Sequence, residues 1–496
     1  MPSITSEPTY KVLFVASECA PYAKAGGLAD VAASLPKALR RMGCDVRIVM
    51  PLYASIDRDK YGIEYEGTAC VHMGGGEENW IGVYSATLDR EVPVWFVEYE
   101  RFFGRSGIYD EPWGEYGDNA FRFALLSKAA MQICKDRQFI PDIMHLHDWP
   151  TAVTAALLKT WDRILSPLSD TASVLTIHNI GYQGIYHASA YPYIGAGYEH
   201  FNANEFEAHG AINLLKAGIA FADAITTVSP TYAKEIVTPV GGCGLAPYLN
   251  NRSADFFGIL NGADYDHWNP ETDMLIPARY TAQSLTGKLT CKMALQKRLG
   301  LAPHPEWPVF GIVSRFVQQK GFDLLREALP RALETMVMQV AVLGTGQPET
   351  ESFFRWLAHT YPDRVGAYIG FSNEFSHCIE AGSDFFLMPS LYEPCGLNQI
   401  YSLKYGTLPI VRATGGLDDT VENYVEATGD GTGFKFVEPT VDALYYAIGG
   451  AVAAWFDRPH HIEKLRQTAM AKEFSWEASA KKYLEVYARA VHNKRS

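Results

Sequence analysis

Two Gly-Gly pairs, Gly26–Gly27 and Gly415–Gly416, are the first features of the sequence that could do chemistry. Each pair stands where an apolar run gives way to a helical pattern, which leaves backbone N–H groups at the start of a helix open to an anion. Lys24 can place an ammonium group on the first anion, and Thr414 adds an amide to the second turn. Neither turn has the spacing of a P-loop or a dinucleotide-binding fingerprint, so an ordinary strand-to-helix turn is the competing interpretation.

Two cations and a carboxylate follow apolar runs in the second half of the chain. Arg315 and Lys320 could clamp a diphosphate, Arg as a planar fork and Lys as a point charge, although a solvated loop is the alternative. Glu393 lies in a turn rich in Pro and Gly, where it could accept hydrogen bonds from sugar hydroxyls. The amides of Gly396 and Leu397 could meet an anion or a dipole in the same turn.

Histidines and an aspartate end two further apolar runs. The segment HLHDW places His145 and His147 on one face of a strand, a possible metal-ligand geometry, but no third ligand stands at a recognisable spacing. Asp148 and His178 come close together only if their strands are neighbours. Two Asp-x-Asp triplets also occur, but Lys and Arg are available to neutralise phosphate, so we expect chemistry without a metal.

Apolar runs alternate with helical patterns from end to end, which predicts parallel sheets covered by helices on both faces. Strands are expected at 11–17, 45–50, 92–98, 142–146, 173–177, 224–228 and 257–260, and in a second set at 309–314, 339–343, 365–369, 384–388 and 408–411. One sheet of that many strands would be unusually wide, so we expect two doubly wound domains that join within 262–275. Ligands of such domains bind at the carboxyl ends of strands, which puts the expected active site in the cleft between the domains.

Composition and charge limit the kinds of partner. The 496 residues carry 43 basic and 56 acidic side chains, and this net charge of −13 argues against binding to nucleic acid or to an anionic membrane. The eight cysteines form no Cys-x-x-Cys pair, which favours reduced thiols over disulfides or a zinc ribbon. No signal peptide is recognised, and the longest apolar run, 443–456, is too short to span a bilayer and is expected to be a buried helix. We therefore expect a soluble cytoplasmic protein, or a stromal one if a plastid precursor has been processed.

Seven segments together resemble one family, the bacterial glycogen synthases and plant starch synthases. In chain order they read SECAPYAKAGGLADV, HLHDW, TIHNIGYQG, ILNGADYDHWNP, VSRFVQQKGFD, YEPCGLNQIYSLKYGTLPIV and ATGGLDDTV. The resemblance implies an α/β GT-B fold, with two Rossmann-like domains facing a central cleft. The N-terminal domain is expected over 1–262, the donor-binding domain over 263–478, and a final helix over 479–496 that packs back on the first domain.

The resemblance also implies an activity and the residues that perform it. Glucose passes from ADP-glucose to the non-reducing 4-OH of an α-1,4-glucan, with retention of configuration and without a metal or other cofactor. The catalytic positions are Lys24, Asp148, His178, Arg315, Lys320 and Glu393. The donor-binding positions are Gly26, Gly27, Asn261, Cys395, Gly396, Leu397, Tyr401, Thr414, Gly415 and Gly416. The acceptor-side positions are Glu18, Tyr109, Trp113, Tyr116 and Asn179, of which the aromatic ones are expected to stack on sugar faces.

Two positions depart from broader patterns, and several alternatives stay open. Ala25 replaces the threonine that usually precedes the glycine pair, which removes a hydroxyl but no charge. Tyr401 stands where many retaining GT-B enzymes have a second glutamate, and tyrosine is characteristic of this family. The alternatives are a UDP-glucose-preferring synthase, a GT-B transferase with another acceptor such as sucrose or trehalose phosphate, and a silent glucan-binding relative. An oxidoreductase is disfavoured, because its phosphate fingerprint should follow the first strand, and the Gly-x-Gly at 344–346 lies in the wrong half of the chain. The oligomeric state stays open.

Overall fold

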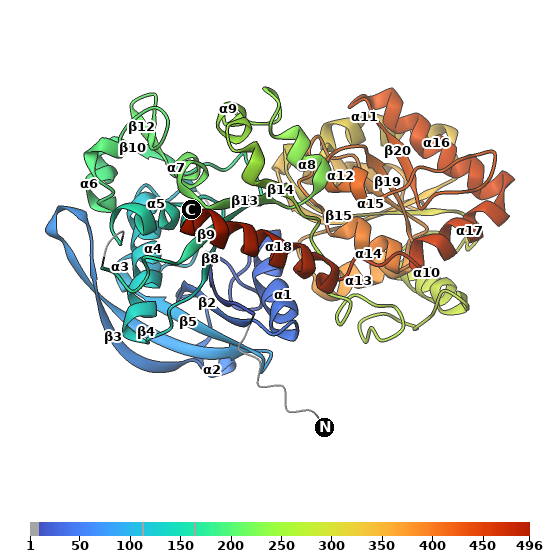
Figure 1. Ribbon diagram of the computed structural model, residues 1–496. Helices are drawn as coiled ribbons and strands as arrows, with labels where there is room; N and C mark the ends of the chain where they lie inside the picture. Colours follow the sequence, from blue (N-terminus) through green and yellow to red (C-terminus); the bar gives the residue numbers. More distant parts are fainter. Residues whose placement is uncertain (1–8, 112–113, 163–164) are drawn as a thin grey trace. The chain divides into compact units, whose positions relative to one another are not determined.

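The computed structural model describes residues 9–111, 114–162 and 165–496 (Figure 1). Contacts divide the chain into two compact units, one of residues 1–262 and 476–496 and the other of residues 263–475. The helix α18 (Trp476–Arg495) returns the chain to the first unit, and the predicted start of the last segment at 479 falls inside it. Gly262 lies against this helix start, since a Cβ at Gly262 would come within 2.6 Å of the Trp476 nitrogen.

The first unit is built on a nine-stranded sheet in the order β14-β13-β9-β8-β1-β2-β5-β4-β3. The strands are β1 (Lys11–Val15), β2 (Asp45–Pro51), β3 (Glu64–His72), β4 (Glu78–Leu88), β5 (Val92–Glu98), β8 (Ile143–His147), β9 (Ala172–Ile177), β13 (Ala224–Thr227) and β14 (Phe256–Gly258). The central strands are apolar and buried on both faces, as in a parallel sheet between helices. The helix α18 packs against α1 and β9 of this unit.

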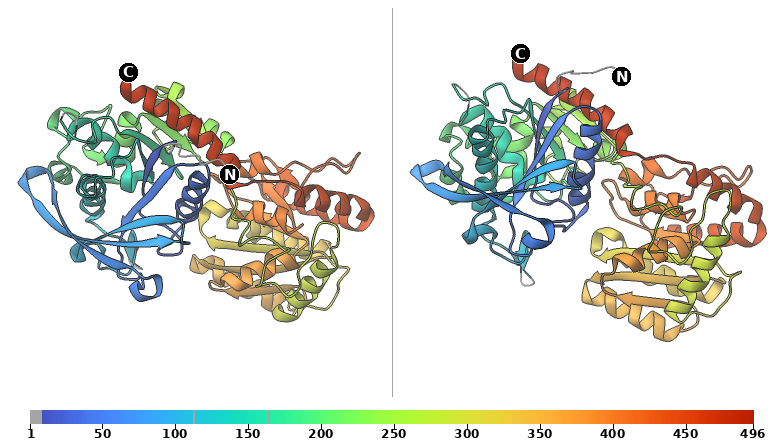
Figure 2. Two further views of the ribbon diagram at one scale, coloured as in Figure 1. Left: turned by 60° about the horizontal axis from the view of Figure 1, so that its bottom comes forward. Right: turned by 90° about the horizontal axis from the view of Figure 1, so that it is seen from below.

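A long hairpin at one edge departs from the predicted parallel pattern. β3 and β4 pair with each other antiparallel, and β4 also runs antiparallel to β5. Both views of Figure 2 show this hairpin (blue) at the edge of the first unit's sheet. No strand was predicted there, because the hairpin alternates exposed and buried residues instead of forming a continuous apolar run. The sheet is therefore mixed.

Helices and short strands complete the first unit. The helices are α1 (Gly27–Arg41), α2 (Arg58–Tyr61), α3 (Glu100–Phe103), α4 (Asn119–Asp136), α5 (Asp148–Thr160), α6 (Tyr191–Ile194), α7 (Leu214–Phe221), α8 (Pro230–Glu235) and α9 (Ala246–Asn250). The short strands are β6 (Asp110–Glu111), β7 (Gly114–Glu115), β10 (Ile185–His187), β11 (Glu207–Ala208) and β12 (Ala211–Asn213).

The second unit has a parallel six-stranded sheet in the order β17-β16-β15-β18-β19-β20. Its strands are β15 (Val309–Phe316), β16 (Gln339–Gly346), β17 (Val365–Ile369), β18 (Phe385–Met388), β19 (Leu408–Arg412) and β20 (Phe434–Phe436). Its helices are α10 (Thr286–Leu299), α11 (Phe322–Thr335), α12 (Pro348–Thr360), α13 (Asn373–Gly382), α14 (Asn398–Lys404), α15 (Gly415–Thr420), α16 (Val441–Asp457) and α17 (Pro459–Met470).

Successive residues of these strands enter different cores, which shows that helices cover both faces of the second sheet. Phe310 and Val340 pack in one cluster with residues of α11, α16 and α17, whereas Val309 and Ala341 pack in another with residues of α10 and α13. α16 corresponds to the predicted buried helix, but only one side is buried and Tyr446 is 67% exposed. No helix in the described part of the chain is both long and apolar enough to cross a membrane.

Candidate active site

Three neighbouring parallel strands bring predicted catalytic residues of the first unit together. β1 pairs with β8, and β8 pairs with β9, so their carboxyl ends meet at one edge of the sheet. Glu18 follows β1, Asp148 follows β8, and His178 follows β9. The condition set by the sequence, that the strands before Asp148 and His178 be neighbours, is therefore met.

The first glycine turn binds the carboxylate of Glu18. Glu18 Oε2 accepts hydrogen bonds from the backbone N–H groups of Ala25, at 2.5 Å, and of Gly26, at 2.8 Å. The turn thus holds an anion, here a side chain of the same unit. A Cβ added to either glycine of the pair would meet no atom within 4 Å, so packing does not demand glycine there. The exposed Lys24 ammonium lies 2.7 Å from Asp30 Oδ1 in the next turn of chain.

The hydroxyl group of Tyr109 binds Glu18, whereas the prediction for Tyr109 concerned its ring, which was expected to stack on a sugar. Its hydroxyl donates a hydrogen bond to Glu18 Oε1 at 2.6 Å and lies 2.7 Å from the Ser17 hydroxyl oxygen. Its ring packs against Phe123 and Trp149, with centroids 5.9 and 6.1 Å away. Tyr109 therefore positions Glu18, and through it the glycine turn, and its stacking on a sugar stays a prediction.

The other aromatic residues expected on the acceptor side give a similar picture where they are described. The guanidinium groups of Arg105 and Arg122 each lie 4.7 Å from the Tyr116 ring centroid, a cation–π contact. The Tyr116 hydroxyl donates to Glu111 at 3.1 Å. Trp113 lies outside the described residues. No pattern in the sequence indicated that Arg122, which is fully buried, organises this segment.

Burial keeps the groups at the ends of β8 and β9 uncharged. Asp148 Oδ1 accepts a hydrogen bond from the His178 N–H at 2.6 Å and a longer one from Asn179 at 3.4 Å, yet burial raises the pKa of Asp148 to about 8. Burial also lowers the pKa of His178 to about 3. His178 Nε2 lies 3.0 Å from His147 Nδ1, and the His147 ring stacks on His145. These neutral rings are partners of one another.

Asn261, a predicted donor-binding residue after β14, has an unused acceptor. Its side chain is 6% exposed, and its Oδ1 atom has no hydrogen-bond partner among the described residues. A buried amide oxygen without a partner is unfavourable, so such an atom is a place where a bound molecule can supply the missing donor.

In the second unit, Lys320 and Ser390 fix the carboxylate of Glu393. Lys320 Nζ and Ser390 Oγ donate to the same oxygen, Glu393 Oε2, at 2.6 and 2.9 Å. β15 pairs with β18, so the loops that follow these strands, which carry the three residues, lie together. Arg315 is exposed at the end of β15, and no residue in the described ranges accepts a hydrogen bond from its guanidinium. Ser390 was not predicted as a site residue, although its position just after a buried strand could have indicated it.

The second glycine turn is packed tightly against the Glu393 loop. A Cβ on Gly415 would lie 1.9 Å from the Glu393 carbonyl oxygen, and one on Gly416 would lie 2.1 Å from that of Cys395. The Gly416 N–H donates to the Glu393 carbonyl oxygen at 3.1 Å. Gly396 has a φ of 71°, a left-handed conformation that favours glycine. Cys395 is 5% exposed, as expected of a packing residue.

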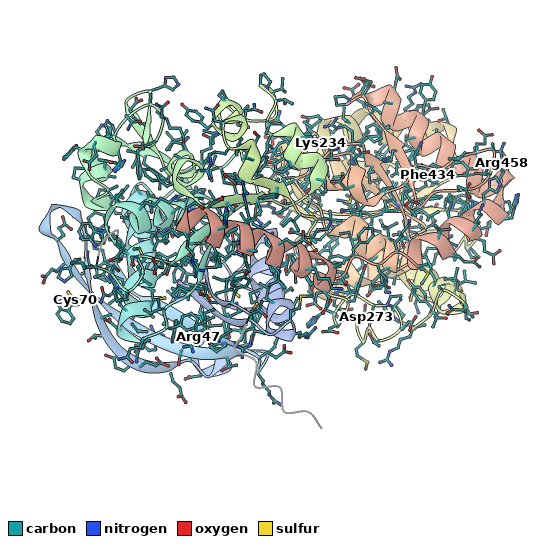
Figure 3. All side chains as sticks on the ribbon, in the orientation of Figure 1. Arg47, Cys70, Lys234, Asp273, Phe434 and Arg458 are labelled. Atoms are coloured by element: carbon teal, nitrogen blue, oxygen red, sulfur yellow. The ribbon has the colours of Figure 1, made fainter. Side chains whose placement is uncertain are left out.

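Tyr401 belongs to an aromatic stack that the sequence did not predict. Its ring stacks on Trp268 at 4.2 Å, and Trp268 also stacks on His377 at 3.7 Å. His377 Nδ1 lies 2.7 Å from Asp273 Oδ2, which also accepts a hydrogen bond from the Tyr405 hydroxyl at 2.5 Å. Figure 3 labels Asp273 in the second unit. Asp273 and Tyr405 lie 132 positions apart, so no local pattern connects them.

The two units offer different chemical groups. The first has anion-binding amides, with a neutral imidazole and a neutral carboxyl group at neighbouring strand ends. The second has a lysine beside a fixed carboxylate and an exposed arginine at the end of β15. Leu397 and Thr414 directly precede α14 and α15 there. Cations and amides suit phosphate, and a carboxylate suits sugar hydroxyls.

Comparisons with known proteins identify the family. The profile of the starch synthase catalytic domain matches residues 11–251, and that of glycosyl transferases group 1 matches residues 300–467. Glycogen synthase 1 of Geobacter metallireducens is 47% identical over 98% of this chain and 97% of its own length. The glycogen synthase of Treponema denticola is 45% identical over 98% of this chain and 99% of its own.

Solved structures agree with these matches. The catalytic domain of starch synthase IV from Arabidopsis thaliana, bound to ADP and acarbose, is 35% identical with a TM-score of 0.89, and the match covers 97% of this chain and 99% of that chain. Sucrose-phosphate synthase from Thermosynechococcus elongatus, at 16% identity and a TM-score of 0.58, shares the fold alone. The predicted GT-B fold of two Rossmann-like domains is confirmed. The chain belongs to the family of bacterial glycogen synthases and plant starch synthases, and it is a glycosyltransferase.

Proposed function

We propose that this enzyme transfers glucose from ADP-glucose to the non-reducing 4-OH of an α-1,4-glucan such as glycogen, with retention of the α configuration. The observation that carries the proposal is the buried Glu393 carboxylate, which Lys320 and Ser390 hold at the end of the second unit's strands. A carboxylate fixed in this way can accept hydrogen bonds from sugar hydroxyls while the lysine remains beside a phosphate. The glycogen synthase names of the relatives, and the ADP bound to the plant starch synthase, support this choice of substrates.

In the proposed reaction, the bond between glucose C1 and the diphosphate breaks and a bond from C1 to the acceptor oxygen forms on the same face. The acceptor hydroxyl proton passes to the departing diphosphate. Negative charge grows on the diphosphate, and the cationic side chains of Lys24, Arg315 and Lys320 stabilise it. Because these side chains supply the positive charge, the proposed transfer needs no metal or other cofactor, and EDTA should leave its initial rate unchanged.

The first unit contributes neutral groups to the proposed transition state. Burial lowers the pKa of His178 to about 3, so its ring adds no positive charge next to a cationic sugar. Its backbone carbonyl is then free to stabilise that sugar. The orphan Asn261 Oδ1 can accept a hydrogen bond from the donor, which would satisfy it.

One assay tests the proposal against its alternatives. Purified protein is incubated with glycogen and either ADP-glucose or UDP-glucose, and release of the nucleoside diphosphate is followed. We expect faster release from ADP-glucose, and new glucose units that an α-1,4-specific glucosidase removes. Faster release from UDP-glucose would establish the UDP-glucose-preferring synthase. If neither donor turned over, the proposal would be rejected in favour of a glucan-binding relative without this activity.

A further inference from the structure

The outer face of the β3–β4 hairpin carries a cysteine, a histidine and a glutamate side by side. Cys70 and His72 are two residues apart on β3, so both side chains point to the same face of the sheet. Glu78 lies directly opposite His72 in the antiparallel register, which puts its side chain on that face as well. Figure 3 labels Cys70 on this hairpin. The opposite face carries the buried residues Ala69 and Val71.

The spacing of the three side chains is that of a metal site. The sulfur of Cys70, a ring nitrogen of His72 and a carboxylate oxygen of Glu78 all lie within 4.8 Å of one another. His72 Nδ1 is 3.4 Å from Glu78 Oε1. Tetrahedral zinc with its usual bond lengths separates neighbouring ligand atoms by about 3.3–3.8 Å. The histidine and glutamate are already at that separation, and a small rotation of the side chains brings in the thiol.

We propose that Cys70, His72 and Glu78 bind a thiophilic divalent metal ion, Zn²⁺ in the first place. A thiolate and an imidazole favour zinc over Mg²⁺ or Ca²⁺, which prefer oxygen ligands. Three protein ligands leave one position for water. On binding, the thiol proton of Cys70 passes to solvent and a sulfur–metal bond takes its place, so the step involves no oxidation or reduction.

The charges around the three residues favour a cation. Glu78 and the nearby Asp136 place negative charge beside the Cys70 thiol. The nearby Lys128 does not compete for the carboxylate, because its ammonium donates to the His72 carbonyl oxygen at 3.2 Å.

The site is open to solvent and far from the proposed chemistry. His72 and Glu78 also line a cavity of about 670 Å³ with the glycine segment 74–76, which gives a metal ion a way in. β3 is the fourth strand along the sheet from β1, a separation of about 19 Å at the usual strand spacing. A metal here would tie the edge strand to its neighbour near the end of the hairpin, and it would have no part in glucosyl transfer.

The test is a titration of the full-length protein with Co²⁺, followed by competition with Zn²⁺. The matched control is Cys243→Ser. In the described part of the chain Cys243 is exposed, Cys70 is partly exposed, and the other cysteines are buried. We expect a thiolate-to-cobalt absorption band in the wild type and in Cys243→Ser, and no such band in Cys70→Ser. We expect Zn²⁺ affinity to fall at least about tenfold in each of three variants, Cys70→Ser, His72→Gln and Glu78→Gln. Loss of a residue that merely hydrogen-bonds a metal ligand already lowers metal affinity by about tenfold or more, so loss of a ligand should cost no less.

Thermal unfolding gives a second readout that does not depend on activity. Saturating Zn²⁺ should raise the Tm of the wild type and of Cys243→Ser but not that of Cys70→Ser. His72 and Glu78 are more than half exposed, so their variants should keep the metal-free Tm of the wild type. A thiolate band that persists in Cys70→Ser, or a Zn²⁺ affinity that none of the three substitutions changes, would overturn the proposal.

Discussion

The same tripeptide, Gly-Gly-Leu, opens α1 in the first unit and α15 in the second, and the two copies do different work. At Gly26 and Gly27 a Cβ would meet no atom within 4 Å, whereas at Gly415 and Gly416 it would lie about 2 Å from backbone oxygens. Glycine in the second turn is required by close packing against the Glu393 loop. In the first turn it is not required by packing, so the empty space is available to a ligand.

The surroundings of the two turns differ in charge as well. The first adjoins a buried carboxyl group and imidazoles that burial keeps neutral. The second locks a loop whose carboxylate is paired with a lysine. A glycine pair at the start of a helix can therefore leave room for a ligand in one place and allow close packing of the backbone in another. Only the surrounding atoms distinguish the two roles.

Breaking the ion pair of the second unit should have the largest effect. Lys320→Ala removes a positive charge from the leaving diphosphate and leaves Glu393 without its cation, so we expect kcat to fall by about 100-fold or more. Steady-state release of the nucleoside diphosphate measures this. The matched control is Lys404→Ala, which removes a lysine of similar exposure, 18% against 21%, that pairs with Glu473 on the same unit. Equal rates in the two variants would contradict the role of Lys320.

Gly416→Ala tests whether the second glycine turn is constructional. The new Cβ would lie 2.1 Å from the Cys395 carbonyl oxygen, so backbone must shift, at a cost of about 2–3 kcal/mol in the free energy of unfolding. The midpoint of urea unfolding measures it. Gly27→Ala, at the same place in the other Gly-Gly-Leu, is the control and should not lower the midpoint. If both substitutions lower it equally, the contrast between the turns is wrong.

Asp148→Asn tests whether the first unit's carboxyl group is neutral. Its folded pKa of about 8 lies above the unfolded value of 3.8, so the folded state holds an extra proton between these limits. The free energy of unfolding should therefore fall as pH rises from about 4 to about 8, by at most about 1.4 kcal/mol per pH unit. Asparagine does not titrate, and it tolerates the left-handed backbone found here, with φ 54°.

Urea unfolding of the wild type and of Asp148→Asn, compared across that range, gives the answer. The stability advantage of the wild type over the variant should shrink steadily as pH rises. A difference that stays constant would show that Asp148 is already ionised in the folded protein.

The site residues that directly follow apolar strands could be predicted from the sequence. Continuous apolar runs marked β1, β8, β9, β15 and β18, and parallel strands carry functional residues at their carboxyl ends, so Asp148, His178, Lys320 and Glu393 could be singled out in advance. Their catalytic roles, and the choice of Glu18, came from the resemblance to the family. The partners of the site residues could not be predicted. Tyr109 reaches Glu18 from 91 residues away, and Asp273 reaches Tyr405 from 132 residues away. Such pairs arise from tertiary packing, which leaves no local periodicity.

The β3–β4 hairpin was missed for a related reason. Exposed and buried residues alternate along it at the sheet edge, so it has no continuous apolar run, and its strands run antiparallel where a parallel sheet was expected. The difference between the two Gly-Gly-Leu turns was equally invisible, because identical residues carry opposite packing.

Gly26→Ala is the finest probe of the comparison, with the smallest expected effect. Alanine fits the extended backbone of Gly26, at φ −146°, and meets no neighbour, so the free energy of unfolding should stay within about 0.5 kcal/mol of the wild type. If the empty space receives the donor's phosphates, the methyl group intrudes on them, and we expect kcat/KM for the donor to fall about tenfold while KM for glycogen holds. A loss of stability without a change in kcat/KM would show instead that the first turn is constructional, like the second, and that its open space serves no ligand.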